Sequence, residues 1–580
     1  MHEFSVWAPY ASSMQLQIGA AKYTMSEVSG GWWHAAADAP PGAEYSFLID
    51  SDPTPYPDPR GLRQSGGVHG PSRIYDHKAH VWHDQSWHGP PLTGGVIYEI
   101  HVGTFTQGGT FDSAIERLPF LAQLGITHLE LMPIAAFPGQ FGWGYDGVAL
   151  FAVAEIYGGP DALKRFVDAC HQHGLAVILD VVYNHFGPVG NYTNRFGPYL
   201  TSNHRTPWGE AVNFEEGGSD EVRRFFCDNA LMWMRDYHID GLRLDAVHEY
   251  MDRSAIHFME QMSSEVDVLS STLERRLVLI AESDLNDPRV VTPREAGGMG
   301  MDAQWSDDFH HSLFTLLHKN EAGMGYYDDF GTMEDLAKSL REVFVYDGIY
   351  SIYRQRKHGR PVPRLSAHHF IGFIQNHDQI GNRAMGDRIE HIIGLPRAKV
   401  ALAIVMLAPF IPMLFQGEEY AADTPFQYFA DHEDPDVARS VAEGRKKDFA
   451  AFGWNPDEIP NPESRETLDR SKLNWDEVEQ GKHAEMLEWT RGLIRLRRGS
   501  PSLNDGDLSH IKVRYDGEKR WLLMARGGIR LICNLGTEAH LCPNPDHLAL
   551  LMKSAEGVEL TDTHVVVPPD SVAILSGEAT

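Results

Sequence analysis

The segment GLRLDAV, residues 241–247, places an arginine and an aspartate within a run of apolar residues. Because side chains alternate between the two faces of a strand, the two leucines share one face, and Arg243 shares the other face with Asp245. A guanidinium group beside a carboxyl group favours the charged carboxylate and lowers its pKa. The segment therefore predicts that Asp245 is a nucleophile and that Arg243 keeps it ionised.

A second carboxyl group, Glu282, follows the apolar run LVLIA at residues 277–281. Burial behind such a run raises the pKa of a carboxyl group and keeps it protonated. One charged and one neutral carboxyl group supply the nucleophile and the general acid that hydrolysis of a glycosidic bond requires. Either segment alone favours a structural ion pair over a catalytic group, so the interpretation depends on further polar groups at the same place in the fold.

Eight short apolar runs alternate with amphipathic helical segments, and this alternation predicts a parallel sheet closed into a (β/α)₈ barrel of the TIM type. The runs cover residues 96–103, 128–134, 176–184, 241–247, 277–283, 302–309, 370–378 and 413–420. Active sites of such barrels lie at the C-terminal ends of the strands. The third run ends in Asp180 and Asn184, and the seventh ends in His377 and Asp378, so several strands bring polar groups to one rim.

The chain around this barrel divides into three predicted domains of an α/β protein. Residues 1–85 contain short alternating segments typical of an antiparallel β-sandwich, residues 95–495 form the catalytic barrel, and residues 500–580 return to short strands in a second β-sandwich. The most apolar run, residues 400–415, is too short for a membrane span and contains two prolines. It predicts a buried helix followed by a buried strand.

Composition limits the partners of the 580-residue chain. Its formal net charge of −30 argues against binding to nucleic acid or to an anionic membrane, because both require a basic face. The four cysteines lack disulfide or zinc spacing, and the first residues lack a signal peptide, which favours a cytoplasmic protein with free thiols. We expect a monomer or a homodimer. The 30 histidines show no convincing ligand spacing, so no catalytic metal is expected.

Four short blocks resemble, in order, those of the α-amylase superfamily of glycoside hydrolases: DVVYNH (180–185), GLRLDAVH (241–248), IAES (280–283) and QNHDQ (375–379). The resemblance implies that Asp245 forms a covalent glycosyl-enzyme, that Glu282 is the acid and later the base, and that Asp378 stabilises the transition state. It also implies retention of anomeric configuration, with the two catalytic carboxyl groups roughly 5 Å apart.

The same resemblance implies a set of substrate contacts in and beside these blocks. Tyr145, in the segment FGWGYDG, would stack on a sugar ring. The other expected contacts are His185, Arg243, Leu244, Ala246, Val247, His248, Asp307, Asp308, Phe309, His310, His311, His377, Gln379, Ile380, Gly381 and Asn382. No cofactor is implied. A structural calcium is not expected either, because Glu249 stands where calcium-binding members carry a histidine.

Within the superfamily, longer segments such as LIAESDLNDPR and FIQNHDQIGNRAMGDR resemble the enzymes that release trehalose from maltooligosyltrehalose. This resemblance implies hydrolysis of the α-1,4 bond next to a terminal trehalose unit, with other α-glucan oligosaccharides as further ligands. The N-terminal segment at residues 4–18 resembles a domain of branching and debranching enzymes, which leaves a glucan branching or debranching enzyme as an alternative. A non-catalytic glucan-binding protein is a third hypothesis.

Overall fold

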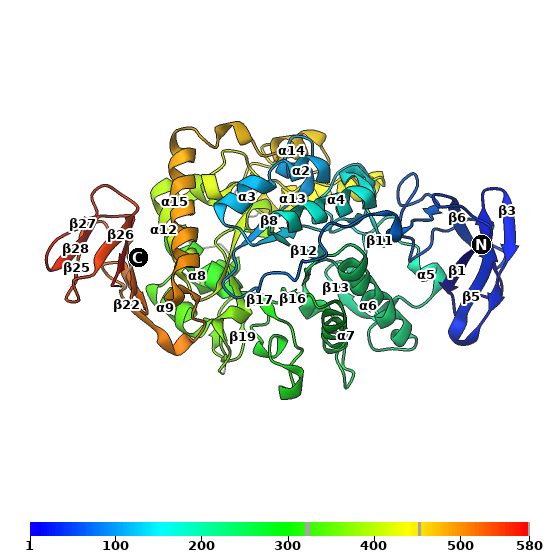
Figure 1. Ribbon diagram of the computed structural model, residues 1–580, viewed down its shortest axis with the longest axis horizontal. Helices are drawn as coiled ribbons and strands as arrows, with labels where there is room; N and C mark the ends of the chain where they lie inside the picture. Colours follow the sequence, from blue (N-terminus) through cyan, green and yellow to red (C-terminus); the bar gives the residue numbers. More distant parts are fainter. Residues whose placement is uncertain (319–324, 363, 451–453, 578–580) are drawn as a thin grey trace.

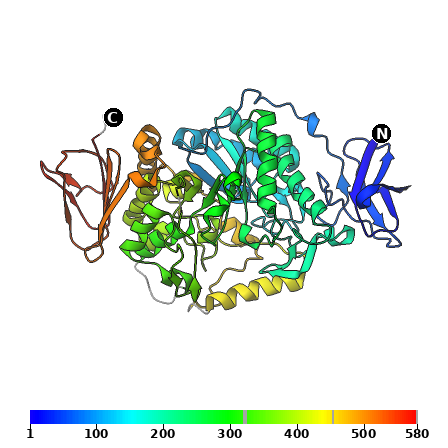
Figure 2. The same ribbon diagram turned by 90° about the horizontal axis from the view of Figure 1, so that it is seen from below.

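The computed structural model describes residues 1–318, 325–362, 364–450 and 454–577. A central barrel with its helices lies between two β-rich units at opposite ends of the molecule, and each unit carries one chain terminus (Figure 1). The view in Figure 2 shows the same elongated arrangement from below. Because the barrel occupies the middle of the molecule, both terminal units flank it and neither covers the other.

Eight parallel strands close the barrel; seven lie within predicted apolar runs, and the eighth, β21, begins two residues before its run at 413–420. The strands are β8 (Ile97–Ile100), β9 (His128–Leu131), β12 (Ala176–Val181), β15 (Gly241–Leu244), β16 (Val278–Ala281), β17 (Ala303–Trp305), β20 (Phe370–Gly372) and β21 (Ile411–Phe415). The predicted α/β fold with a TIM barrel is therefore confirmed.

The alternation of side chains across each barrel strand separates two apolar layers. Ile97, Ile178 and Ile280 belong to a cluster formed mainly by residues of the barrel strands. The two leucines of β15 pack instead into the large core shared with the helices. Arg243, between those leucines, consequently points into the barrel, as the period of two predicts.

The longer helices pack around this barrel: α4 (Gly159–Gln172), α6 (Ser219–Asp236), α7 (Phe258–Leu273), α8 (Asp307–His318), α9 (Met333–Glu342), α12 (Leu395–Leu407), α13 (Pro435–Ala450) and α15 (Gly481–Gly499). The apolar run at residues 400–415 forms the end of α12 and all of β21, so the predicted helix followed by a strand is confirmed. Within the described residues, no helix combines the length and the apolar character that crossing a membrane requires.

The terminal units are small antiparallel sheets. At the N-terminus β1 (His2–Trp7), β4 (Ser26–Glu27) and β5 (Trp32–Ala37) form one sheet, and β2 (Met14–Ile18), β3 (Ala21–Thr24), β6 (Glu44–Ile49) and β7 (Ser72–Arg73) form another. At the C-terminus β22 (Ile511–Asp516), β23 (Trp521–Arg526), β24 (Ile529–Asn534), β26 (Ala549–Lys553) and β29 (Ser571–Ser576) form one sheet, and β25 (His540–Pro543), β27 (Glu559–Leu560) and β28 (His564–Val567) form the other. The domain boundaries remain predictions. Helix α15 runs past the expected boundary at 495, and residues 578–580 of the third domain lie outside the described residues.

A buried ionic network joins elements at the N-terminal end of the barrel. Nδ1 of His171, near the end of α4, lies 2.8 Å from Asp84, and its Nε2 lies 2.9 Å from Asp240, which precedes β15. All three side chains are almost completely buried. Burial lowers the pKa of His171, but Asp240 and Asp84 outweigh it, so the net pKa is raised. The imidazolium form therefore stabilises the folded state.

We expect His171→Gln to lower the free energy of unfolding by about 3 kcal/mol at pH 6, because two buried carboxylates lose their shared cation. A raised pKa in the folded state stabilises the protein fully below the unfolded value of about 6.5, and this contribution is lost as pH rises through the folded value. Urea unfolding of both proteins at pH 6 and pH 9 should show a smaller difference at pH 9. His173→Gln, at the exposed end of the same helix, is the control, and an equal loss at both pH values would contradict the assignment.

Candidate active site

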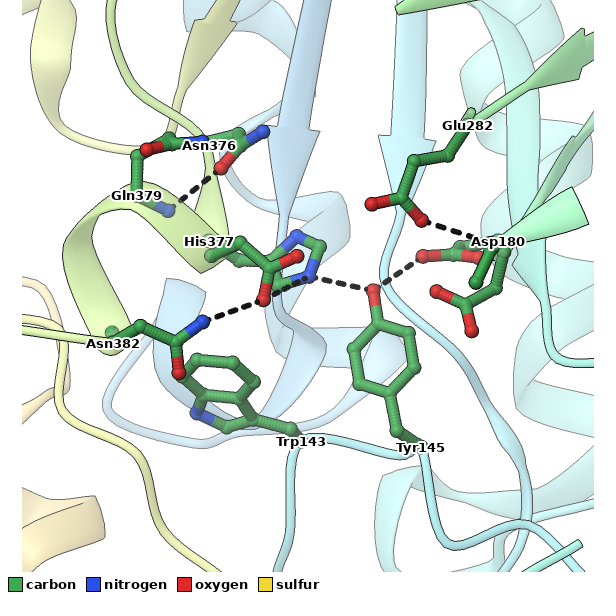
Figure 3. Close-up of polar contacts among 12 residues, drawn as sticks. Trp143, Tyr145, Asp180, Glu282, Asn376, His377, Gln379 and Asn382 are labelled. Atoms are coloured by element: carbon green, nitrogen blue, oxygen red, sulfur yellow. Dashed lines mark hydrogen bonds and ion pairs between the residues drawn. The ribbon is translucent and has the colours of Figure 1, made fainter. Parts of the chain in front are cut away.

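The C-terminal ends of β12, β15, β16 and β20 bring their polar side chains to one rim of the barrel (Figure 3). Asp180 comes from β12, Arg243 from β15, and Glu282 follows β16 directly. The short helix α10 (His377–Gly381) begins just beyond β20 and carries Asp378. Four strand ends that lie far apart in the sequence thus form a single polar site.

Arg243 is the centre of this site and is completely buried. Its Nη1 donates to Asp180 at 2.6 Å and to Asp245 at 3.0 Å. Its Nη2 donates to Oε2 of Glu282 at 2.7 Å. The guanidinium group also lies 4.1 Å from the centre of the Trp305 ring, a cation–π contact. One guanidinium therefore holds both expected catalytic carboxyl groups in fixed positions.

The expectation that Arg243 lowers the pKa of Asp245 is correct for the arginine but wrong for the net shift. Burial raises the pKa of Asp245, Arg243 lowers it, and the carboxylates of Asp180 and Asp378 raise it further. The net pKa is raised, because burial and the two neighbouring carboxylates outweigh the guanidinium, which Asp245 shares with Asp180 and Glu282. Asn184 supplies a second donor to Asp245, at 2.9 Å from its Oδ2 atom.

Glu282 behaves as its apolar approach predicts. Burial raises the pKa of Glu282, while Arg243 lowers it and the neighbouring Asp245 raises it. The backbone N–H of Ala246 donates to Oε2 at 2.9 Å, the atom that already accepts from Arg243. Because Oε2 accepts both bonds, the proton of the acid form belongs on Oε1. Ala246 holds this N–H in place with a left-handed φ of 40°, a strained conformation that is common at functional sites.

Asp378 lies on the opposite side of the site and its side chain is 37% exposed. Nδ2 of Asn382 donates to its Oδ1 at 3.2 Å, and Nε2 of His377 lies 3.5 Å away. His377 is itself held by Glu99, which accepts from both its backbone N–H and its Nδ1. Burial lowers the pKa of His377, but Glu99 and Asp378 raise it to about 9, so it is an imidazolium at neutral pH.

Tyr145 connects the two sides of the site (Figure 3). Its hydroxyl donates to Oδ2 of Asp180 at 2.5 Å and lies 2.8 Å from Nε2 of His377. The backbone oxygen of Tyr145 lies 3.1 Å from His185, the residue that follows Asn184. Its half-buried ring is available for the predicted stacking on a sugar.

Several other expected contacts have side chains that the fold buries. Leu244 packs in the core outside the barrel strands, Phe309 packs against Phe410, and Ile380 belongs to a cluster with Trp143. Their apolar side chains have at most 1% exposure, so we assign them to positioning their neighbours. Val247, also buried, donates its backbone N–H to the carbonyl oxygen of Glu282.

The expected contacts after β17 also divide into buried residues and half-buried residues near the site. The carboxylate of Asp308 is buried and accepts from the backbone N–H groups of Val345 and Tyr346, which makes it structural. Asp307 is half-buried, and burial together with Glu282 raises its pKa well above the usual range. His310 is buried, whereas the half-buried His311 lies against the ring of Tyr327.

Four expected contacts remain near the rim. His248 is half-buried and close enough to Glu282 to affect its pKa, and Asn382 is exposed. Gln379 accepts from the hydroxyl of Tyr327 at 2.7 Å. Gly381 is packed so closely on Trp143 that a Cβ atom would lie 2.0 Å from its ring. A larger residue at position 381 would therefore displace Trp143.

The sequence interpretation did not assign roles to Glu99, Trp143, Asp180 and Asn184, all of which contact predicted site residues. Asp180 and Asn184 carried a signal, because they end a predicted strand. Glu99 carried a weaker one, as the only acid in its apolar run. Its pairing with His377 joins residues 278 positions apart, which a sequence pattern does not reveal.

One group of possible metal ligands occurs among the described residues, away from this rim: Asp423, Glu477 and His483. Lys482 also pairs with Asp423, so a cation from the protein already balances that carboxylate. Asn184, expected near a calcium site in related proteins, donates instead to Asp245. The absence of a structural calcium stays a prediction.

Comparisons with known proteins agree with this geometry. The family model "Alpha amylase, catalytic domain" matches residues 71–205, and a domain of unknown function, DUF3459, matches residues 506–574. A malto-oligosyltrehalose trehalohydrolase from Rhizobium sp. (strain M-11) is 48% identical over 99% of this chain and 97% of its own length. One from Mycobacterium tuberculosis (strain ATCC 25618 / H37Rv) is 45% identical over 96% of each chain.

Solved structures show the same fold. A putative α-amylase from Salmonella typhimurium superposes with a TM-score of 0.91 and 36% identity, covering 99% of this chain and 97% of the other. A pullulanase from group B Streptococcus, bound to maltotetraose, superposes with a TM-score of 0.76 at 16% identity, covering 100% of this chain and 86% of its own, which shows the fold alone. Because relatives of high identity match over nearly their whole length, the chain belongs to the malto-oligosyltrehalose trehalohydrolase family and is a glycosidase of the α-amylase type.

Proposed function

We propose that this protein hydrolyses the α-1,4-glucosidic bond next to the terminal trehalose of maltooligosyltrehalose, releasing trehalose and a maltooligosaccharide. The observation that carries the proposal is the placement of Asp245 and Glu282 on the two terminal nitrogens of one buried arginine. The identity of 48% to a malto-oligosyltrehalose trehalohydrolase over 99% of the chain supports the substrate. Asp378 completes the proposed catalytic set.

In the first step, a carboxylate oxygen of Asp245 attacks the anomeric carbon and forms a glycosyl-enzyme. The bond to the leaving oxygen breaks at the same time, and Glu282 gives that oxygen its proton, so trehalose leaves as a neutral alcohol. Arg243 and Asn184 donate to Asp245 and favour its charged form against burial. Asp378, backed by the charged His377, is placed to hold hydroxyl groups of the distorted sugar.

In the second step, water replaces trehalose beside Glu282. The Glu282 carboxylate accepts a proton from the water, the hydroxide oxygen bonds to the anomeric carbon, and Asp245 leaves as a carboxylate. Two inversions return the original α configuration. Both steps use the same pair of carboxyl groups, so Arg243 acts throughout the cycle by holding them apart and in register.

The remaining proposals concern partners and location. We propose maltooligosyltrehalose and other α-glucan oligosaccharides as ligands, and a monomer or a homodimer as the working form, which light scattering after size-exclusion chromatography measures. The four cysteines are buried and form no disulfide, which supports a cytoplasmic location.

Incubation with maltotriosyltrehalose tests the substrate directly. We expect equimolar trehalose and maltotriose, with the maltotriose released first as its α anomer, because a double displacement retains configuration. Proton NMR of the early products measures both quantities. Absence of free trehalose would refute the proposal.

The same assay separates the two alternatives. A branching or debranching enzyme would act on amylose, glycogen or pullulan, and the trehalose unit of maltotriosyltrehalose would stay linked to its oligosaccharide. A non-catalytic glucan-binding protein would release nothing from any of these substrates. The N-terminal sheets favour the first alternative no more than the proposed function, since relatives that match this chain over nearly its whole length also contain this region.

A further inference from the structure

Glu130, on β9, is a buried carboxyl group that the proposed reaction does not use. The residue is 1% exposed, and neither oxygen has a hydrogen-bond partner among the described residues. Leu129 and Leu131 pack outward with the helices, so the side chain between them points into the barrel. An ionised carboxylate in such a place would cost several kcal/mol unless a cation or donors matched it.

The residue next to Glu130 in the barrel is a second acid. Glu99 on β8 is its direct partner in the register of the two parallel strands, and both side chains face inward. The carboxylate of Glu99 is already matched, because it accepts from the backbone N–H and from Nδ1 of His377. Two adjacent buried carboxyl groups do not both ionise when one cation is available.

The cations around Glu130 make their hydrogen bonds to other groups, and the one remaining donor, Nε of Arg243, has no partner among the described residues and so does not bond Glu130. Asp180 approaches from β12, Arg243 from β15 and His377 from α10, in addition to Glu99 from β8. Both terminal nitrogens of Arg243 are occupied by other carboxyl groups. Burial is the largest effect raising the pKa of Glu130, and Glu99 is the second. Together they outweigh Arg243, so the net pKa lies well above the usual range.

A protonated Glu130 has two carboxylates among its neighbours that can accept a hydrogen bond. Oδ1 of Asp180 is buried with no hydrogen-bond partner in the described part of the chain, and the Glu99 carboxylate offers lone pairs. A carboxylic acid O–H among such oxygens attracts them, whereas a carboxylate would repel them. Asp180 in turn accepts from Arg243 and Tyr145, and Glu99 holds His377, so both neighbours lead directly to the catalytic groups.

We propose that Glu130 is a positioning residue, an uncharged carboxylic acid beneath the sugar site. Because Glu130 carries no charge, the ionised Glu99 pairs with His377 alone. Glu130 also holds in place the carboxylates of Asp180 and Glu99, which support Arg243 and His377 respectively. The positioning role rests on the proposed hydrolysis, whereas the uncharged state of Glu130 is independent of it. Glutamine at this position keeps a donor and has no charge. Leucine keeps most of the volume and has neither donor nor charge.

Infrared difference spectroscopy of the full chain tests the charge without any substrate. The spectrum of the wild type minus Glu130→Gln should show loss of a protonated carboxyl band and no loss of a carboxylate band at pH 7. Glu518→Gln, at an exposed turn, is the matched control and should lose a carboxylate band instead. Loss of a carboxylate band in Glu130→Gln would overturn the proposal while leaving the trehalose assay untouched.

Steady-state kinetics on maltotriosyltrehalose tests the positioning role. We expect Glu130→Leu to lower kcat about tenfold with KM unchanged, the size of one hydrogen bond lost near the reacting groups, and Glu130→Gln to rescue most of that loss. Thermal unfolding checks that both variants fold. If leucine does not fold, a kcat of Glu130→Gln within about threefold of the wild type supports the role. Equal losses in the two variants would overturn it.

Discussion

Asp245→Asn should lower kcat on maltotriosyltrehalose by at least about 10⁴-fold, because the amide oxygen is too weak a nucleophile to form the glycosyl-enzyme. Asparagine keeps the shape of the side chain and one acceptor oxygen for Arg243, and it gives up the second acceptor, which receives a hydrogen bond from Asn184 in the native site. The loss should therefore be chemical, with the fold intact. Single-turnover kinetics and circular dichroism measure the two properties, and turnover within tenfold of the wild type would refute the assignment.

Chemical rescue makes this result specific for a nucleophile. Asp245→Ala removes the carboxylate and leaves space beside the anomeric carbon, where added azide can attack while Glu282 still protonates the leaving oxygen. The expected product is a maltooligosyl azide of β configuration, because a single displacement inverts the α centre. An azide of α configuration would place the nucleophile elsewhere. Asn382→Ala, which removes an exposed partner of Asp378, is a variant that should give no azide product.

The strand ends were predictable from the sequence because two local rules agree there. Apolar runs alternate with amphipathic helices, which defines the barrel, and the period of two within GLRLDAV sends Arg243 inward while its flanking leucines pack outward. Glu282 follows the same logic, since the apolar residues before it bury it and raise its pKa. These properties depend on neighbours in the sequence.

The direction of the net pKa shift of Asp245 was not predictable in this way. The sequence shows one neighbouring cation, whereas the folded site shares that cation among Asp180, Asp245 and Glu282, and burial outweighs it. The partner of Asp180 is 63 positions away, and the register of β12 with β15 is what brings the two together. Pairings of this kind are set by the closure of the barrel.

Helix α13 shows a similar limit. Its charged sequence is typical of a solvated helix face, and the helix has no buried residues. Arg445 nevertheless donates to the carbonyl oxygen of Gly381, at the end of the helix that carries Asp378. The long side chain of Arg445 therefore connects this helix to the site, and hydrophobic periodicity does not detect such a contact. Figure 2 shows this helix, in yellow, along the edge of the barrel.

Glu282→Gln should lower kcat on maltotriosyltrehalose by about 10³-fold or more, because trehalose then leaves without a proton. The glutamine amide keeps the contacts that Arg243 and the N–H of Ala246 make with Oε2, so the substitution removes the proton from Oε1 and little else. Native thermal unfolding is the control for the fold. Normal turnover of the natural substrate would refute the assignment of the acid.

An α-maltooligosyl fluoride separates the two steps that Glu282 serves, since fluoride leaves without protonation. Glu282→Gln should release a burst of about one fluoride per active site and then stall, because no base activates water against the glycosyl-enzyme. Mass spectrometry of the stalled protein should find the sugar on Asp245, whereas Asp245→Asn should give no burst at all. A burst from the asparagine variant, or none from the glutamine variant, would contradict these roles. Arg243 also binds Asp180, but that carboxylate is almost completely buried, which leaves Asp245 and Glu282 as the two reactive carboxyl groups on the arginine.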